Sequence, residues 1–482
     1  MQLRAYFGPS QNPFDSTFRI ANPTFQVDKQ HQDSTINKYI DECLEITLKE
    51  SSKLIQTYSK QDKKQQQTQQ QLNKIKTICR THDIDILNSD KNLGFVILPK
   101  SWEQKETETQ LSDTNTYKLI SSKKELHQIY KQYKINITPL IIKINKNFNQ
   151  TQSTYIKHHL QNFNFNYIPK FYLLPKIHKT THIPKLKGRP IVGAHSAITT
   201  PLSKWVDHHL KQYIYKCDTL IKDTPHLINN LSTLKLKPND HLFTLDLESL
   251  YTNINIERGI ILVYKFLIEI AHIPTHKAKI ITCALNLVLS FSVFQTKSHS
   301  IYRQICGTSM GTNGAPSFAN IYVYMCEYML VRKFYSLSKL ICYYRFLDDI
   351  FGVFRGSPEE FLKFKENLQT SININVTCDF NFDRVVMLDC IIYKGPSFNL
   401  TNTLDITTYI KPTNLFTYIP YNSFHPPNTL KSLVYNQLRR FIITNTIYEN
   451  YIQLKHSFFN QLRQRGYPPF ILSPLFKQIL YS

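Results

Sequence analysis

Residues 343–354 read YYRFLDDIFGVF, where two adjacent carboxylates, Asp348 and Asp349, lie between two largely apolar runs. Apolar runs of this length around paired acids predict a β-hairpin that presents both carboxylates at its tip. Adjacent carboxylates repel each other, and burying either one unpaired is costly, so such a tip favours water or a divalent cation. Because Asp is an ordinary turn former, the pair taken alone is also explained as a solvated turn.

A third acid occupies a second predicted strand. Residues 241–247 read HLFTLDL, and alternation along a strand places Phe243, Leu245 and Leu247 on one face and Asp246 on the other. Magnesium prefers oxygen ligands, usually one or two carboxylates plus substrate phosphates, and a pair of metal ions can clamp an in-line phosphoryl transfer. Asp246, Asp348 and Asp349 are therefore candidates for such a site.

Longer stretches around these acids resemble the palm motifs of reverse transcriptases. Residues 243–254 read FTLDLESLYTNI, residues 307–320 read GTSMGTNGAPSFAN, and residues 344–351 read YRFLDDIF. Their order and spacing are similar to those of the palm motifs, and their residue identities most resemble those of the Penelope-like retroelements.

Further stretches agree with this resemblance on both sides of the palm, over about residues 85–445. A single short match is weak evidence, whereas several in the expected order are strong. The matching stretches are Asp90-Lys91, FYLLPKIHK at 171–179 and KGRPIV at 187–192 for the fingers, LDCIIY at 388–393 for the primer-grip strand, and YIKPT at 409–413, SFHP at 423–426 and QLRR at 437–440 for the thumb side.

The resemblance implies an α+β fold of the right-hand polymerase type, with fingers, an antiparallel palm sheet flanked by helices, and a helical thumb. The expected divisions are an N-terminal extension with a Gln-rich tract over 1–80, fingers and the start of the palm over 81–240, the palm with its catalytic motifs over 241–395, and the thumb over 396–482. Within the extension, the apolar spacing predicts a helix over 34–55, while the polar tract 59–71 fits either a linker or an exposed helix.

The resemblance also assigns the catalytic set. Asp246 and Asp348 are the expected metal ligands, joined by the backbone carbonyl of Leu247, and Asp349 is the less certain third acid beside the metals. Two Mg²⁺ ions are the expected cofactors, with Mn²⁺ as an alternative. The structural alternative is that the three acids fall among these motifs by chance.

Four residues are candidates for nucleotide binding. Tyr251 lies where reverse transcriptases place a ring against the sugar 2′ position, which would exclude ribonucleotides by a clash. Arg189 is the first choice for the triphosphate because a guanidinium grips phosphate oxygens bidentately, and Lys187 and Lys91 are weaker candidates. A packed core tyrosine and a solvated basic loop are the corresponding structural alternatives.

Met310 and Gly311 in the stretch at 307–320 are two more candidates for nucleotide binding, and the chain departs from the common reverse transcriptase sequence at Met310 and at Phe346. Gly311, Gly314 and Pro316 suit a loop whose backbone approaches the nucleotide or template closely. Met310 stands where many relatives carry Gln, so we expect only an apolar contact from it. Phe346 replaces the usual Tyr of the hairpin, which keeps the packing and removes one hydrogen bond.

Composition fits these expectations without proving them. The chain has 58 Lys and Arg against 35 Asp and Glu, a formal net charge of +23, as expected for a protein that follows a phosphate backbone, although other basic proteins share this feature. Nine cysteines without a C-x-x-C pair argue against a secreted disulfide framework. With no leader or membrane-spanning stretch apparent, we expect an intracellular, nuclear protein that has no membrane partner.

The function that follows is RNA-directed DNA synthesis by a retroelement enzyme, with an RNA template, a DNA primer and deoxynucleoside triphosphates as partners. Many Penelope-like elements carry a GIY-YIG nuclease after the thumb, and too few residues follow Arg440 for such a domain, so we expect an element that lacks it. The alternatives are a telomerase-like or viral RNA-templated polymerase, and a nucleic-acid-binding protein that keeps the fold without catalysis.

Overall fold

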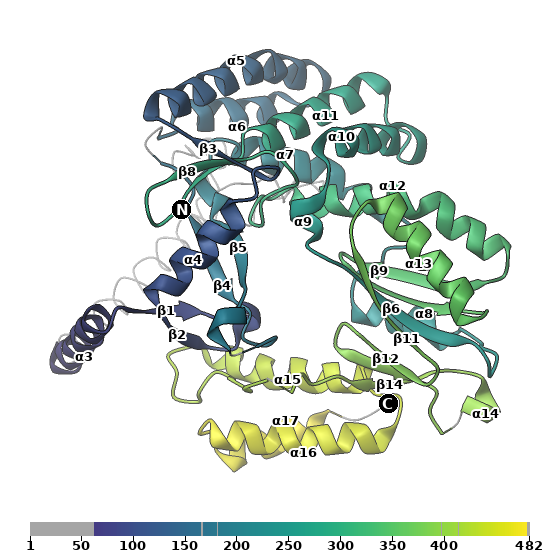
Figure 1. Cartoon of the computed structure of the whole chain (residues 1–482). Helices are drawn as coiled ribbons and strands as arrows, with labels where there is room; N and C mark the ends of the chain where they lie inside the picture. The colour runs from purple at the N-terminus through teal and green to yellow at the C-terminus, as the bar shows by residue number, and fades with distance from the viewer. Residues whose placement is uncertain (1–61, 165–166, 181, 397, 413, 480–482) are drawn as a thin grey trace, which may run out of the picture. The chain divides into compact units, whose positions relative to one another are not determined.

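The computed structural model describes residues 62–164, 167–180, 182–396, 398–412 and 414–479 (Figure 1). The helix expected over 34–55 lies outside these residues. The chain divides into two compact units, of which one contains the described residues up to Asn88 together with Phe95–Lys105, and the other contains Ser89–Gly94 and the chain from Glu106 onward. The predicted domain boundaries stay predictions.

The first unit begins with a polar helix followed by a hairpin. Helix α3 spans Asp62–Thr81, so the described part of the Gln-rich tract is helical, in keeping with the helix propensities of Gln and Lys. Strands β1 (Ile84–Asn88) and β2 (Phe95–Pro99) pair antiparallel. Helix α4 (Lys100–Leu111) follows directly.

The second unit contains a four-stranded antiparallel sheet. Its order is β11-β6-β10-β9, and β10 pairs with both β6 and β9. The two runs around the adjacent acids are therefore neighbouring strands, as predicted. The bounds are β6 His241–Leu247, β9 Leu340–Phe346, β10 Asp349–Phe354 and β11 Val376–Asn381.

Two helices cover one face of this palm sheet. Helices α12 (Ala315–Ser336) and α13 (Pro358–Ile372) lie over it (Figure 1). The ring of Phe243 lies 5.0 Å from that of Phe361 on α13, as expected for the apolar side of an alternating strand. A capping box at Ser357 and Glu360 satisfies the first amides of α13 and fixes where this helix starts.

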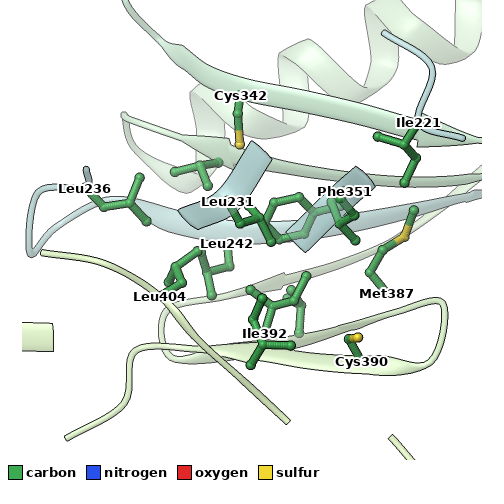
Figure 2. Packing of buried hydrophobic residues seen from close by; sticks show 14 of the residues in the cluster. Ile221, Leu231, Leu236, Leu242, Cys342, Phe351, Met387, Cys390, Ile392 and Leu404 are labelled. Atoms are coloured by element: carbon green, nitrogen blue, oxygen red, sulfur yellow. The ribbon is translucent and has the colours of Figure 1, made fainter. Parts of the chain in front are cut away.

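The opposite face is covered over only part of its length. A small antiparallel sheet, β12 (Arg384–Met387), β13 (Cys390–Tyr393) and β14 (Asp405–Thr408), encloses a buried apolar core with the palm strands and helix α8 (Thr224–Ser232) (Figure 2). Leu242 of β6 is fully buried in this core. Asp246, on the same face four residues later, is exposed. The apolar core thus covers the end of this face near Leu242, whereas the end that carries Asp246 stays open.

The segments predicted as fingers pack with helices and small strands that come after β6 in the sequence. Helix α11 packs against α5 and α7, and α5 packs against α6 (Figure 1). Strand β8 lies between β3 and β7, and β4 pairs with β5. The bounds are α5 Lys123–Asn147, α6 Gln150–Gln161, α7 Thr200–Lys211, α9 Leu250–Asn253, α10 Ile256–Lys265, α11 Thr275–Ser290, β3 Tyr117–Ile120, β4 Phe171–Pro175, β5 Gly188–Val192, β7 Val293–Gln295 and β8 Ile301–Gln304.

Three helices follow the small sheet, which confirms the expected helical thumb. They are α15 (Pro427–Ile443), α16 (Tyr448–Gln464) and α17 (Pro469–Gln478), and they enclose a core of their own. The cysteines of the described residues are free thiols. Within the same residues, no helix combines the length and hydrophobicity that crossing a bilayer requires.

Candidate active site

The three predicted carboxylates meet at the open end of the palm sheet. Asp349 opens strand β10 and is the direct register partner of Asp246 on β6, so both side chains project from the same face. Asp348 lies in the two-residue turn before β10, and its carbonyl oxygen accepts a hydrogen bond from the Leu247 amide at 3.1 Å. We expected both acids at the tip of the hairpin. Only Asp348 lies in the turn, whereas Asp349 is the first residue of β10.

The electrostatics of this end of the sheet favour a cation. Burial raises the pKa of Asp349 to about 6, and the charges of Asp348 and Asp246 act in the same direction. Partial desolvation of its carboxyl group also raises the pKa of Asp246, although the residue as a whole is exposed, and Asp348 is the next cause. Like charges close together disfavour ionisation of each other, so the metal-free protein holds these carboxylates at an energetic cost.

The carboxylates provide part of a magnesium coordination shell. In the described part of the chain, no three or more His, Cys, Asp or Glu side chains are arranged to hold a metal by themselves. Mg²⁺ commonly takes one or two carboxylates and completes its shell with water and substrate phosphates, which two or three acids on an open sheet end allow. The ligand role predicted for the Leu247 carbonyl stays a prediction.

A groove of about 260 Å³ lies directly beside the acids. Asp246 and Asp349 line it together with Thr244 and Thr377 of the palm sheet and Met387 of β12. The carboxylates therefore face a space between the palm sheet and the β12–β13 hairpin, where an extended chain end could reach them.

Three lysines from distant segments carry positive charge towards the acids. Lys91 and Lys179 partly offset the rise in the pKa of Asp246, and Lys91 and Lys411 do the same for Asp349. They come from the segment after β1, the segment after β4 and the segment after β14. Three cations from separate segments near an acidic site are suited to a polyanionic ligand.

Arg189 is held beside this cluster by a buried acid. Its Nε lies 3.0 Å from Oδ1 of Asp90, whose side chain is only 5% exposed. Asp90 and Lys91 are adjacent, so one short segment positions the arginine and supplies a lysine. Lys187 is placed differently, since its side chain is 66% exposed and its Nζ lies 3.8 Å from Oε2 of Glu106. The structure thus brings Arg189 and Lys91 towards the acids and turns Lys187 to another partner.

Tyr251 lies close enough to Asp348 and Arg189 for both charges to act on its hydroxyl. It is half-buried on α9, and burial raises its pKa, with Asp348 raising it further and Arg189 lowering it. Its carbonyl oxygen accepts a hydrogen bond from the Thr308 amide at 2.7 Å. A Cβ at Gly307, whose φ is +68°, would lie 2.2 Å from that same oxygen, so only glycine fits there. This contact fixes the backbone that carries the ring.

Met310 and Gly311 contact the fingers through their backbone. The Met310 carbonyl accepts a hydrogen bond from the Val192 amide at 3.0 Å. Gly311 has φ +122°, and a Cβ there would lie 2.1 Å from the Val192 carbonyl oxygen. The close approach thus joins this loop to the end of β5, the strand of Arg189. Contact of either residue with a nucleotide stays a prediction.

Arg345 is a functional candidate that we did not single out from the sequence. Its side chain is fully buried, and its Nε donates to both carboxylate oxygens of Glu327 at 3.1 Å. Its Nη1 donates to the Leu347 carbonyl at 3.1 Å and to Asn320 Oδ1 at 3.0 Å. Leu347 has a φ of 56°, an unfavourable value for a branched residue, so this bond helps to hold the turn that carries Asp348.

The only sequence signal for Arg345 is a lone charge within an apolar strand. Such a charge is more often a solvated residue than a buried one, and only the Glu327 of a helix packed on the sheet decides between them. Lys411 gives a similarly weak signal, since its position in the YIKPT stretch does not indicate that it reaches Asp349.

Comparisons with known proteins bear on the fold. A family model described as an animal helix-turn-helix domain matches residues 417–476, which include α15 and α16. No curated protein sequence matches the chain. Telomerase from Candida albicans, in complex with a TWJ fragment of telomeric RNA, is similar in structure with a TM-score of 0.55 and 10% identity, over 83% of this chain and 67% of that one.

Two other solved structures align less closely. Apo telomerase from Candida tropicalis has a TM-score of 0.44 at 10% identity, over 83% of this chain and 70% of its own. The RNA-dependent RNA polymerase of BmCPV at its elongation state has a TM-score of 0.41 at 11% identity, over 73% of this chain and 32% of that chain. With the likeness to the Candida albicans enzyme, the α+β right-hand polymerase fold expected from the sequence is confirmed.

We expect Asp349→Asn to stabilise the metal-free protein at neutral pH and to have little effect near about pH 4. The folded state keeps a proton on Asp349 up to a pKa of about 6, whereas the ordinary value is 3.8, so this group's contribution to stability falls as pH rises between the two. Melting temperatures in EDTA at acidic and neutral pH would test this. Asp379→Asn, an exposed acid on the same face, is the control, and equal shifts at both pH values would contradict the expectation.

Arg345→Met should lower the free energy of unfolding by about 3–5 kcal/mol, because it leaves the Glu327 charge buried and unpaired. Chemical denaturation would measure this loss, and adding Glu327→Gln should recover part of it. Arg332→Met, which removes an exposed ion pair with Asp218 from the same helix as Glu327, should cost at most about 1 kcal/mol. Similar losses of unfolding free energy for Arg345→Met and Arg332→Met would show that the buried pair contributes no more to stability than the exposed pair.

Proposed function

We propose that this chain is an RNA-directed DNA polymerase of a retroelement, which extends the 3′ end of a DNA primer on an RNA template. The observation that carries the proposal is the meeting of Asp246, Asp348 and Asp349 at the open end of the palm sheet, with cations directed at them from other segments. A transferred phosphoryl group needs this combination of ligands for cations and donors for a triphosphate.

The triphosphate of the incoming nucleotide would lie against the basic cluster. Arg189, held by Asp90, offers a planar fork that matches phosphate oxygens, and Lys91, next to Asp90 in the chain, adds a second positive charge. Lys411 lies next to Lys91 and extends the cluster from the thumb side of the palm. Lys187 has a smaller role in this proposal because Glu106 already pairs with it.

Asp246 and Asp348, with the Leu247 carbonyl, would hold two Mg²⁺ ions, or Mn²⁺ in their place. Such ions lower the pKa of a primer hydroxyl and neutralise the charge of the transferred phosphate. Asp349 lies opposite Asp246 and adds to the negative potential that draws a cation to this end of the sheet. Arg345 positions the turn of Asp348 from beneath.

The sugar of the nucleotide would lie against Tyr251. Its backbone is fixed by Thr308, and the charges of Asp348 and Arg189, the proposed metal ligand and triphosphate ligand, both act on the pKa of its hydroxyl. A ring in this position leaves no space for a 2′ hydroxyl, so the product would be DNA.

The finer assignment is to a Penelope-like element that acts in the nucleus. It depends on the wording of the stretches at 243–254, 307–320 and 344–351. A telomerase-like enzyme is the second candidate, favoured by the likeness in fold to the telomerase of Candida albicans. A protein that binds nucleic acid without extending it is the third, and the intact set of three acids is the observation against it.

Primer extension on an RNA template with a DNA primer and Mg²⁺ is the direct test. We expect the purified protein to add deoxynucleotides, and Asp348→Ala to reduce the rate by about a hundredfold or more, since the metal site contributes several kcal/mol. Asp379→Ala, which removes an exposed acid from the same groove, should keep most of the activity. Binding of the duplex without extension under varied metal and salt would replace the polymerase by the binding-protein hypothesis.

Tyr251→Val should admit ribonucleotides, lowering the preference for deoxynucleotides by about tenfold or more, because the clash with the 2′ hydroxyl is removed. Tyr251→Phe keeps the ring and should keep the preference. The measurement is kcat/KM for matched deoxy- and ribonucleotides on one template. An unchanged ratio in Tyr251→Val would assign the ring to packing.

A further inference from the structure

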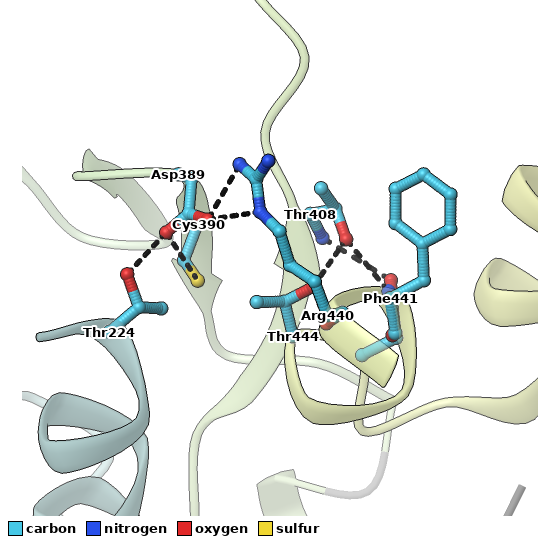
Figure 3. A network of polar contacts seen from close by, with 8 residues as sticks. Thr224, Asp389, Cys390, Thr408, Arg440, Phe441 and Thr444 are labelled. Carbon is cyan, nitrogen blue, oxygen red and sulfur yellow. Dashed lines mark hydrogen bonds and ion pairs between the residues drawn. The ribbon is translucent and has the colours of Figure 1, made fainter. Parts of the chain in front are cut away.

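The QLRR stretch at 437–440 has no role in the proposed chemistry, yet its last residue makes a specific contact. Arg440 on thumb helix α15 donates from Nε to Oδ2 of Asp389 at 2.7 Å, and its Nη2 lies 2.6 Å from the same oxygen (Figure 3). Asp389 belongs to the turn between β12 and β13, in the stretch that resembles a primer grip. The two stretches are thus joined by an ion pair.

Asp389 is held from two further sides. Its other carboxylate oxygen accepts a hydrogen bond from the Thr224 hydroxyl on α8 (Figure 3). Its backbone carbonyl accepts one from the Tyr409 amide at 2.7 Å, just after β14. The residue before it, Leu388, has a φ of 56°, so the turn is tight and its tip has little freedom of its own. Because Asp389 pairs with Arg440, a movement of Arg440 would either shift this turn or break the ion pair.

The C-terminal end of α15 has a second, buried attachment one turn after Arg440. Thr444 and Thr408 hydroxyls lie 2.6 Å apart, and Asn445 accepts from Thr407 and donates to Thr408, both at 2.8 Å. Thr444 and Asn445 are almost completely buried. This attachment holds the end of α15 to β14 and provides a pivot, while the Arg440 pair sets the direction of the helix beyond it.

The ion pair itself is much more accessible than the pivot. The side chains of Arg440 and Asp389 are 45% and 24% exposed. An ion pair that water reaches contributes little to global stability and breaks readily. A buried pivot beside a breakable pair is an arrangement that suits a reversible change in the position of a helix.

We propose that Asp389 and Arg440 are positioning residues that couple thumb helix α15 to the β12–β13 turn, and so keep the thumb closed on primer and template during successive additions. This rests on the proposed polymerase function. The competing role for Arg440 is a phosphate contact with the duplex, as expected of an exposed arginine on a basic protein.

The two roles predict opposite effects of Asp389→Asn. Loss of the coupling should shorten products, whereas an Arg440 that binds phosphate would be released by the substitution and bind more tightly. The experiment is primer extension on a long RNA template with a trap that allows one binding event per enzyme, scored for product length and, separately, for the rate of the first addition.

We expect Asp389→Asn and Arg440→Gln each to shorten the mean product about two- to fivefold, and the double variant to be no worse than either single one. The rate of the first addition should stay near that of the unmodified protein. Arg439→Gln removes the neighbouring positive charge of the same helix and serves as the matched control.

Three outcomes overturn the coupling. They are longer products from Asp389→Asn, equal effects of Arg440→Gln and Arg439→Gln, and additive losses in the double variant. A lack of any first addition by the unmodified protein would instead count against the polymerase function, so the two failures are distinguishable. Melting temperatures of the variants should stay close to that of the unmodified protein, which separates lost coupling from unfolding.

Discussion

Like charges crowd the open end of the palm sheet, and the fold must hold them there against their repulsion. The ion pair of Arg345 and Glu327 does this from the opposite face, where Arg345 also bonds the Leu347 carbonyl of the turn. A buried ion pair stabilises a protein only when its remaining donors and acceptors are satisfied. Here Thr219 and Tyr343 donate to Glu327, and Asn320 accepts from Arg345, so the turn is held by a complete network.

Burial of apolar side chains on both faces of the sheet stabilises the strands that carry the strained, charged turn. Helices α12 and α13 bury one face along its length, and the small sheet of β12 to β14 buries the other at one end. The apolar core around Leu242 and Phe351 thereby stabilises the strands whose other ends carry the acids. The site lies where this core stops, with the groove beside it.

Close backbone contacts hold the loop at 307–311 against neighbouring segments near the site. Gly307 lies against the Tyr251 carbonyl and Gly311 against the Val192 carbonyl, and neither position has room for a Cβ. One loop therefore sets the place of the proposed sugar contact and of the strand that carries Arg189. On the far side, the Asp389 pair connects the small sheet to the thumb. The loop at 307–311, the end of β5 and thumb helix α15 are thus each fixed by a specific contact near the site.

The sequence by itself determined the hairpin and the alternation around Asp246, because these depend on local periodicity and on residues close in the chain. The helical thumb followed from the resemblance of its motifs, in their order, to reverse transcriptases. The sequence did not show that Asp349 opens a strand, that Lys187 pairs with Glu106, or that Gly311 approaches Val192, since register and loop contacts are decided between distant segments. Arg345, Lys411 and Arg440 differ little from surface charges in the sequence. Only the tertiary structure decided their partners, because the burial and electrostatic environment of a charge are properties of the packed chain.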